Sequence, residues 1–307
     1  MKRIDSLLVV VVLFVAASIR AAAPTPAERG QTFDTGGVKI WYEVRGGGQG
    51  TPLVLVNGGP GFDHTYLHLS DVWDRLAQTR PVVFYDQRGN GSSSALAKDQ
   101  SCTLADQIAD LDALRAHLGA DKIDLLGHSW GGYLVMAYAS RHPKHIRRLI
   151  ICDSAAPKWS DTRFLFDDIF PETVSKQNAV AFAESLGDKS ASDESIALYL
   201  TMLFYSPEKR DAAQPRLKAA VYKKEINEAL NHDVGRFDLN PELPRFAFPT
   251  LVLTGRYDIN VAPSVAWKIH RAVPGSRFAV FERSGHLPFY EEPDAFLDVV
   301  RAFLDEK

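Results

Sequence analysis

The segment Ile123-Asp-Leu-Leu-Gly-His-Ser-Trp-Gly-Gly132 decides the fold of this chain. It begins as a short apolar run, continues as Gly127-x-Ser129-x-Gly131, and passes directly into an alanine-rich stretch, Tyr133 to Ser140. A strand that turns into a helix at Gly-x-Ser-x-Gly holds its serine on a sharp turn with the hydroxyl exposed above a sheet edge. Glycines beside the serine let backbone and helix pass close to it. The segment therefore predicts a strand, a tight turn and a helix, with Ser129 as the candidate nucleophile.

Outward from this segment, short apolar runs alternate with helical patterns. Val38 to Val44 alternates apolar and polar residues, which is typical of a half-buried strand. Continuous apolar runs predict strands buried on both faces, and they occupy residues 53–56, 82–85, 123–126, 149–152, 251–254 and 278–281. Helices are predicted over residues 104–118, with Thr103 as N-cap and Gly119 at the end, and over 261–273 and 293–304. This alternation predicts an α/β fold with a mostly parallel central sheet and helices on both faces.

One long segment interrupts the alternation. Residues 157–245 contain no apolar run typical of a buried strand, and they are rich in aromatic residues and helical patterns. We expect a helical cap there, inserted before the last two strands and lying over the strand ends. The core would then consist of a first part, residues 37–156, and a second part, residues 246–307.

A serine hydroxyl needs a base and a group that orients the base before it can act as a nucleophile. Asp258 follows the predicted strand 251–254 across a glycine turn, and His286 follows the strand 278–281 in the same way. The order serine, aspartate, histidine is the one that this fold uses. Asp258 could alternatively be only the N-cap of the helix that begins near Val261. Position and order together favour Ser129, His286 and Asp258 as a catalytic triad.

The oxyanion that forms on attack requires hydrogen-bond donors. One is expected to be the backbone N–H of Trp130, directly after the nucleophile. The other is expected from Asn57-Gly-Gly-Pro-Gly61, which follows the apolar run 53–56. Glycines let backbone N–H groups face a ligand, and the N–H of Gly59 is our choice, with Gly58 as the alternative.

Five motifs together resemble an α/β-hydrolase of the proline iminopeptidase and tricorn-interacting aminopeptidase type, over about residues 37–307. They are Asn57-Gly-Gly-Pro-Gly61, Asp86-Gln-Arg-Gly-Asn-Gly-Ser92, Gly127-His-Ser-Trp-Gly-Gly132, Gly255-Arg-Tyr-Asp258 and Gly285-His286. The resemblance implies a serine peptidase that releases an N-terminal residue, often proline, from peptides or amides. It also implies that Asp86 and Arg88 support the floor of the site.

Two positions depart from the family's pattern. Asn57 stands where a histidine is usual, and Ile259 stands where a family member places an amine-binding glutamate after the triad aspartate. A second amine-binding glutamate lies late in the family's cap, and Glu228 fits that place best, with Glu225 one turn away. Alternatives remain: a carboxylesterase or small-amide hydrolase with the same triad, carbon–carbon bond hydrolysis, or a non-catalytic binding protein on a hydrolase scaffold.

The net charge of −3 over 307 residues gives no indication of nucleic-acid binding. No Cys/His spacing predicts a metal, and no cofactor is expected, so the predicted partner is a small peptide, amide or ester substrate. Residues 1–23 combine a basic start, an apolar run and small residues, which predicts a signal peptide for export to the periplasm or the medium. An uncleaved membrane anchor is the alternative. Residues 24–36 are predicted to be a linker, and a disulfide between Cys102 and Cys152 stays open.

Overall fold

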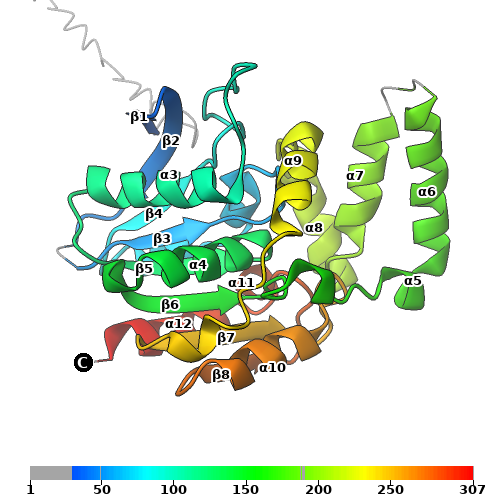
Figure 1. The fold of residues 1–307 in the computed structure, drawn as a ribbon. Coiled ribbons are helices and arrows are strands. Elements are labelled where there is room, and N and C mark those ends of the chain that lie inside the picture. Colours follow the sequence, from blue (N-terminus) through cyan, green and yellow to red (C-terminus); the bar gives the residue numbers. More distant parts are fainter. Residues whose placement is uncertain (1–29, 49, 187, 189–190, 307) are drawn as a thin grey trace, which may run out of the picture.

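The computed structural model describes residues 30–48, 50–186, 188 and 191–306 (Figure 1). The predicted signal peptide or anchor at residues 1–23 lies outside the described residues. Within the described ranges, no helix is both long enough and apolar enough to cross a membrane.

Eight strands form one sheet, in the order β1-β2-β4-β3-β5-β6-β7-β8. The pairs β1–β2 and β2–β4 are antiparallel, and every other pair is parallel, which confirms the mostly parallel sheet. The strands are β1 (Gln31–Thr35), β2 (Val38–Arg45), β3 (Leu53–Val56), β4 (Val82–Tyr85), β5 (Ile123–His128), β6 (Ile146–Cys152), β7 (Thr250–Gly255) and β8 (Arg277–Phe281). All seven predicted strands are present. The strand β6 begins earlier than its apolar run because Ile146 and Arg148 pair with Ile123 and Asp124 of β5, with a register shift between the two pairs.

The predicted linker over residues 24–36 is wrong for its last part. Gln31–Thr35 forms the edge strand β1, which pairs with β2 from Gln31 opposite Tyr42 to Thr35 opposite Val38. Gly36 and Gly37 both have positive φ, as the tight turn between the two strands requires. Phe33 is the buried residue of β1 and packs against Tyr42 and His117. A single buried aromatic in a polar segment is too weak a pattern to predict a strand from sequence alone.

Helices cover both faces of the sheet (Figure 1). One face packs against α3 (Leu104–His117), α4 (Trp130–Arg141) and α10 (Pro263–Ala272). The other packs against α2 (Val72–Leu76), α11 (Pro288–Glu291) and α12 (Pro293–Asp305). Three short 3-10 helices lie in the loops of this part of the chain: η1 (His64–Leu69), η2 (Pro143–His145) and η4 (Leu243–Arg245).

The segment between β6 and β7 is helical, as predicted, and its described residues contribute no strand to the sheet. We call it the cap; it contains η3 (Trp159–Asp161), α5 (Phe166–Ile169), α6 (Pro171–Ser185), α7 (Ala191–Thr201), α8 (Pro207–Leu217) and α9 (Lys224–Val234). In Figure 1 the helices α6 and α7 stand side by side at the outer end of the cap, whereas α9 lies next to the core. The backbone N–H of Leu104 donates to Asp233 at 2.7 Å, which ties α9 to the start of α3.

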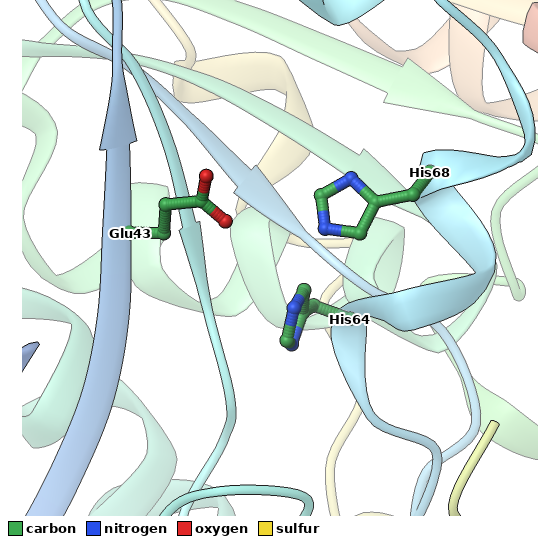
Figure 2. A group of neighbouring side chains, drawn as sticks. All are labelled: Glu43, His64 and His68. Carbon is green, nitrogen blue, oxygen red and sulfur yellow. The ribbon is translucent and has the colours of Figure 1, made fainter. Parts of the chain in front are cut away.

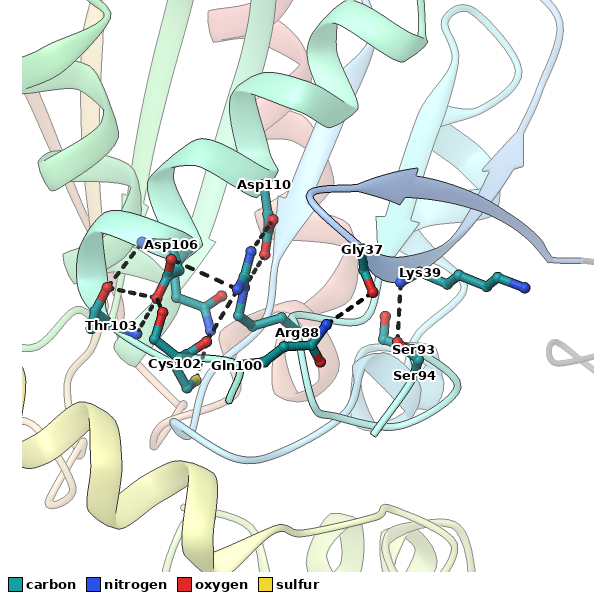
Figure 3. Close-up of polar contacts among 12 residues, drawn as sticks. Gly37, Lys39, Arg88, Ser93, Ser94, Gln100, Cys102, Thr103, Asp106 and Asp110 are labelled. Carbon is teal, nitrogen blue, oxygen red and sulfur yellow. Dashed lines mark hydrogen bonds and ion pairs between the residues drawn. The ribbon is translucent and has the colours of Figure 1, made fainter. Parts of the chain in front are cut away.

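The loop after β4 is anchored by the Arg88 side chain (Figure 3). Its guanidinium donates two hydrogen bonds of 2.7 Å to the carboxylate of Asp110 on α3. The start of α3 is closed by the predicted N-cap Thr103, which forms a reciprocal capping box with Asp106. Arg88 therefore fixes the loop to α3 and has no direct part in the candidate site.

Candidate active site

Ser129 lies at the junction of β5 and α4 with φ 59° and ψ −121°. This backbone conformation is rare for a residue with a side chain, and it is typical of a nucleophile elbow. The flanking glycines are sterically required: a Cβ on Gly127 would lie 2.3 Å from the carbonyl oxygen of Gly131, and one on Gly131 would lie 2.0 Å from that of Val56. The local sequence therefore holds the serine at the carboxyl end of a central strand.

His286 and Asp258 meet at this end of the sheet, from the loops after β8 and β7. The Nδ1 atom of His286 lies 2.8 Å from Oδ2 of Asp258, and both side chains are buried. The other carboxylate oxygen, Oδ1, accepts the backbone N–H groups of Asn260 and Val261 at 2.9 Å each. The carboxylate thus orients the imidazole and also caps a turn, although the helix α10 begins only at Pro263.

Ser129 and His286 line one small pocket of about 30 Å³ beneath the larger cavity. The Nε2 atom of His286 lies 2.8 Å from the side-chain amide of Asn260, and with Nδ1–H donating to Asp258 it accepts a hydrogen bond from that amide. In the described part of the chain, no hydrogen bond joins the Ser129 hydroxyl to His286. Such catalytic hydrogen bonds are often long without substrate and tighten when substrate binds. The Asn260 amide must move aside before Nε2 can accept the serine proton.

The two candidate oxyanion donors lie beside the serine. Gly59 and Trp130 both line the larger cavity together with Ser129. Trp130 is the first residue of α4, so its backbone N–H has no acceptor within the helix. The alternative donor, Gly58, is already occupied, because its N–H donates to the hydroxyl of Tyr66 at 2.6 Å. The geometry therefore favours Gly59 over Gly58.

A chain of hydrogen bonds links the oxyanion loop to the histidine loop. Tyr66 accepts from Gly58 and donates to Nδ1 of His128 at 2.7 Å. On its other side, Nε2 of His128 lies 2.7 Å from the carbonyl oxygen of His286, to which it donates. Burial, and then the neighbouring His286, lower the pKa of His128 well below its usual range, so the ring stays neutral. A neutral ring that carries its proton on Nε2 can accept from Tyr66 and donate to His286, so both hydrogen bonds of His128 are satisfied.

Asn57, the departure from the family's histidine, also holds the oxyanion loop. Its side-chain amide donates to the carbonyl oxygen of Phe62 at 2.7 Å across the loop. Gln87 donates to the backbone carbonyl of Asn57 at 2.9 Å and accepts from the indole N–H of Trp130 at 2.9 Å. Nearby, Asp86 accepts the backbone N–H groups of His64 and Ser92 at 2.9 and 2.8 Å. The residues after β4 thus support the floor of the site.

A second buried carboxyl lies behind the triad. Asp153 follows β6, and its side chain lies in one group with those of Asp258 and His286, in which a ligand atom of each residue is within 4.8 Å of the others. The backbone N–H of Gly255 donates to its Oδ1 at 2.8 Å. Burial, and then the charge of Asp258, raise the pKa of Asp153 well above its usual range. Asp153 therefore holds its proton more strongly than an exposed aspartate does, and it lies behind Asp258, the residue that contacts the imidazole.

A cavity of about 620 Å³ opens between Ser129 and the cap. Its walls include several aromatic side chains, among them Trp159, Phe166 and Tyr199. Among the described residues, the charged side chains that line it are Glu228 and Lys224, both on α9.

Glu225, the second predicted amine-binding residue, does not line this cavity. It lines a separate pocket beside Gly89 and Gly91, because the first turn of α9 faces the loop after β4. The structure therefore places Glu225 outside the cavity that Ser129 lines. Ile259, after the triad aspartate, is buried, and its carbonyl accepts the N–H of Leu165 at 2.8 Å.

Sequence reasoning did not assign roles to four residues near the triad: Tyr66, His128, Asp153 and Asn260. Asp153 was detectable in principle, because it directly follows the apolar run 149–152 at a strand end. Tyr66 and His128 become partners only when the loop after β3 folds beside β5. Asn260 is one of several polar residues in its loop, and only the folded loop turns its amide toward His286.

A model of the alpha/beta hydrolase fold matches residues 51–293, and the chain belongs to this family. Within the family, it is similar to curated proline iminopeptidases. The enzyme from Saccharolobus solfataricus is 32% identical over 88% of this chain and 90% of its own length. That from Lactiplantibacillus plantarum is 33% identical over 87% of this chain and 97% of its own. These matches confirm the resemblance predicted from the motifs.

A solved structure with a different activity is also similar. A thermophilic esterase from Thermogutta terrifontis aligns with a TM-score of 0.67 and 27% identity, covering 89% of this chain and 96% of that one.

Proposed function

We propose that the protein is a serine aminopeptidase that releases an N-terminal residue, with proline among the accepted residues, from small peptides or amides. The observation that carries the proposal is the hydrogen-bonded pair His286–Asp258 beside a serine on a strained elbow, under the cavity between Ser129 and the cap. Similarity to proline iminopeptidases over most of the chain supports the same reaction. The volume of about 620 Å³ suits a substrate of a few residues.

In this mechanism, Nε2 of His286 takes the proton from the Ser129 hydroxyl as the oxygen attacks the scissile carbonyl carbon. The backbone N–H groups of Gly59 and Trp130 stabilise the negative charge that develops on the carbonyl oxygen. His286 then gives its proton to the leaving amine as the C–N bond breaks, and an acyl-enzyme remains. Water then attacks this ester while His286 takes a proton from it, and His286 returns that proton to the Ser129 oxygen as the ester bond breaks. Asp258 keeps Nδ1 protonated and stabilises the imidazolium.

An aminopeptidase must also pair the substrate's ammonium group, because burying it without a partner is costly. Glu228 is proposed for this role, since it is the carboxylate lining the cavity in the described part of the chain. Its helix is held against the oxyanion loop: Asn227 donates its side-chain amide to the carbonyl oxygen of Pro60 at 2.9 Å, and Lys223 donates its N–H to that of Gly61 at 2.8 Å. These contacts keep α9 at a constant position relative to the oxyanion donors.

Removing the charge of Glu228 tests the amine site. We expect Glu228→Gln to lower kcat/KM for prolyl 2-naphthylamide by about 10- to 100-fold, the loss expected for a charge-assisted hydrogen bond. The wild type should strongly prefer this substrate over its N-acetylated form, and the variant should lose most of that preference. Steady-state hydrolysis of both substrates gives the measurement.

Glu225→Gln is the matched control, because Glu225 lies on the same helix but outside the cavity. It should keep wild-type kinetics on both substrates. An unchanged preference in Glu228→Gln would exclude Glu228 as the amine-binding residue and leave the serine mechanism standing.

A carboxylesterase is the second candidate. The buried, apolar Ile259 after the triad aspartate favours it, because that position then offers no carboxylate to an amine. Similarity to a solved esterase at 27% identity also supports it. Equal rates on the free and acetylated amides, or cleavage of p-nitrophenyl esters alone, would favour this function over the aminopeptidase.

We also propose that residues 1–23 direct export, on the basis of their basic, apolar and small-residue order. Cells that express the full chain should release most activity on periplasmic extraction or into the medium, and deletion of residues 2–23 should leave it in the cytoplasm. Activity that sediments with membranes would indicate the uncleaved anchor instead. Activity in the cytoplasm with and without the segment would contradict export.

A further inference from the structure

A second group of potential ligands lies outside the candidate active site, between β2 and η1. Glu43 on β2 and His64 and His68 on η1 each place one ligand atom within 4.8 Å of those of the other two. Figure 2 shows the Glu43 side chain extending from its strand toward the two rings. Glu43 and His64 are 3% and 2% exposed.

Two of these side chains keep an unused acceptor in the interior. Oε2 of Glu43 and Nε2 of His64 are buried, and neither has a hydrogen-bond partner among the described residues. Burying such atoms without a partner is unfavourable, and most buried polar groups in proteins are paired. Glu43 uses its other oxygen, Oε1, to accept from Arg45 at 2.9 Å. Two acceptors cannot satisfy one another, but a cation bound by both would satisfy both.

The partner of His64 on its opposite side fits the same interpretation. Its Nδ1 lies 2.7 Å from Oδ1 of the fully buried Asp86. A carboxylate there accepts the Nδ1 proton, so Nε2 on the other side of the ring keeps its lone pair for another partner. A histidine oriented by a carboxylate in this way is typical of metal ligands, since it fixes the tautomer and raises the basicity of the coordinating nitrogen.

Charge and access also favour a cation. Asp86 and Glu43 place two buried carboxylates around His64, and the guanidinium of Arg45 is shared between Glu43 and Asp74, at 2.9 Å from each. His68 lines a surface pocket of about 540 Å³, so an ion can reach the group from solvent. This pocket is of mixed charge, with Asp71 and Asp74 opposite Lys209 and Arg216.

We infer that Glu43, His64 and His68 form a binding site for a divalent zinc ion, with Asp86 as the residue that orients His64. Two imidazoles and one carboxylate are a ligand set that zinc accepts, with water at the fourth position. The ligand atoms lie within 4.8 Å of one another, and zinc bonds of about 2.0–2.2 Å would require side-chain rotations that bring them closer together. The ion would link β2 to η1, which carries Tyr66, the partner of Gly58 and His128.

Zinc binding to the full chain tests the site, after metal removal and dialysis against limiting Zn²⁺. We expect the wild type to retain one equivalent more than Glu43→Gln and His68→Ala, measured by elemental analysis. Zinc should raise Tm of the wild type by about 5 °C and leave Tm of the two variants unchanged. Replacing zinc by Co²⁺ should give the intense visible bands of a four-coordinate site in the wild type alone.

Two other groups in the described residues provide controls. His145 lies with Asp112 and His142 at the protein surface, where Asp112 already accepts from Arg115 and Tyr138. His286 lies with Asp153 and Asp258. His145→Ala and His286→Ala should both retain the equivalent that is lost in Glu43→Gln. Loss of zinc in either control with retention in Glu43→Gln and His68→Ala would overturn the proposal, as would no tight zinc in the wild type. Circular dichroism of each variant separates loss of binding from loss of folding.

Discussion

Ser129→Ala is expected to lower kcat/KM on prolyl 2-naphthylamide by about 10⁴- to 10⁶-fold. Removal of the nucleophile leaves only substrate binding and oxyanion stabilisation, which in serine hydrolases account for a small part of the rate acceleration. The fold should persist, because the change deletes one hydroxyl that no other described residue binds. Initial rates and labelling with a fluorophosphonate probe give the measurement, and the variant should not react with the probe.

Ser140→Ala provides the matched control for this result. Ser140 lies on the same helix, α4, and its hydroxyl donates to the carbonyl oxygen of Met136 at 2.8 Å, away from the cavity. It should keep both turnover and probe labelling. A Ser129→Ala protein with rates near those of the wild type would exclude the acyl-enzyme mechanism, whatever the substrate.

Asp258→Asn is expected to lower kcat/KM by about 10⁴-fold, because an amide at this position no longer holds Nδ1 of His286 protonated. Asp153→Asn should change the rate by less than about threefold. Burial favours the neutral form of the Asp153 carboxyl, and an amide reproduces the shape of that form together with a donor and an acceptor. The two variants thus distinguish the role of Asp258, which orients the base, from that of Asp153, which lies behind it.

Other results for Asp258→Asn and Asp153→Asn would assign the roles of the two residues differently. A loss below about tenfold in Asp258→Asn would mean that Asp153 replaces it as the partner of His286. A large loss in Asp153→Asn with normal circular dichroism would mean that its proton takes part in catalysis. Both variants should be compared over a range of pH, because a carboxylate that replaces another shifts the acidic limb of the profile.

The raised pKa of Asp153 also predicts how stability depends on pH. Above the unfolded value, near 3.9, the unfolded chain has lost this proton while the folded protein keeps it. The folded state then binds more protons, so the contribution of Asp153 to the free energy of unfolding falls as pH rises toward the folded pKa. Asp153→Asn should remove this decline and stabilise the protein at pH 7 to 8. Denaturant unfolding at several pH values measures the difference; identical pH dependence in both proteins would contradict it.

Much of the core could be predicted from local sequence. The strands β3 and β4 coincide with their apolar runs because parallel strands covered on both faces are apolar throughout. The helix α3 begins at its predicted cap because Thr103 and Asp106 satisfy each other within one turn. The edge strand β1 was missed, since it is largely exposed and only Phe33 enters the core.

The sequence by itself determined the elbow at Ser129, because the glycines at 127 and 131 and the strand-to-helix pattern are all local. It also indicated Asp258 and His286, because the carboxyl ends of parallel strands meet at one edge of the sheet. Only the tertiary structure decided which neighbours each group has. In the folded protein the N–H of Gly58 donates to Tyr66, and the Asn260 amide contacts His286. Asp153 lies behind Asp258, and Glu225 lies outside the cavity. Glu43 also lies close to His64 and His68, although no sequence motif joins residues at this spacing. Such contacts join residues far apart in the chain, and their geometry depends on how whole elements pack.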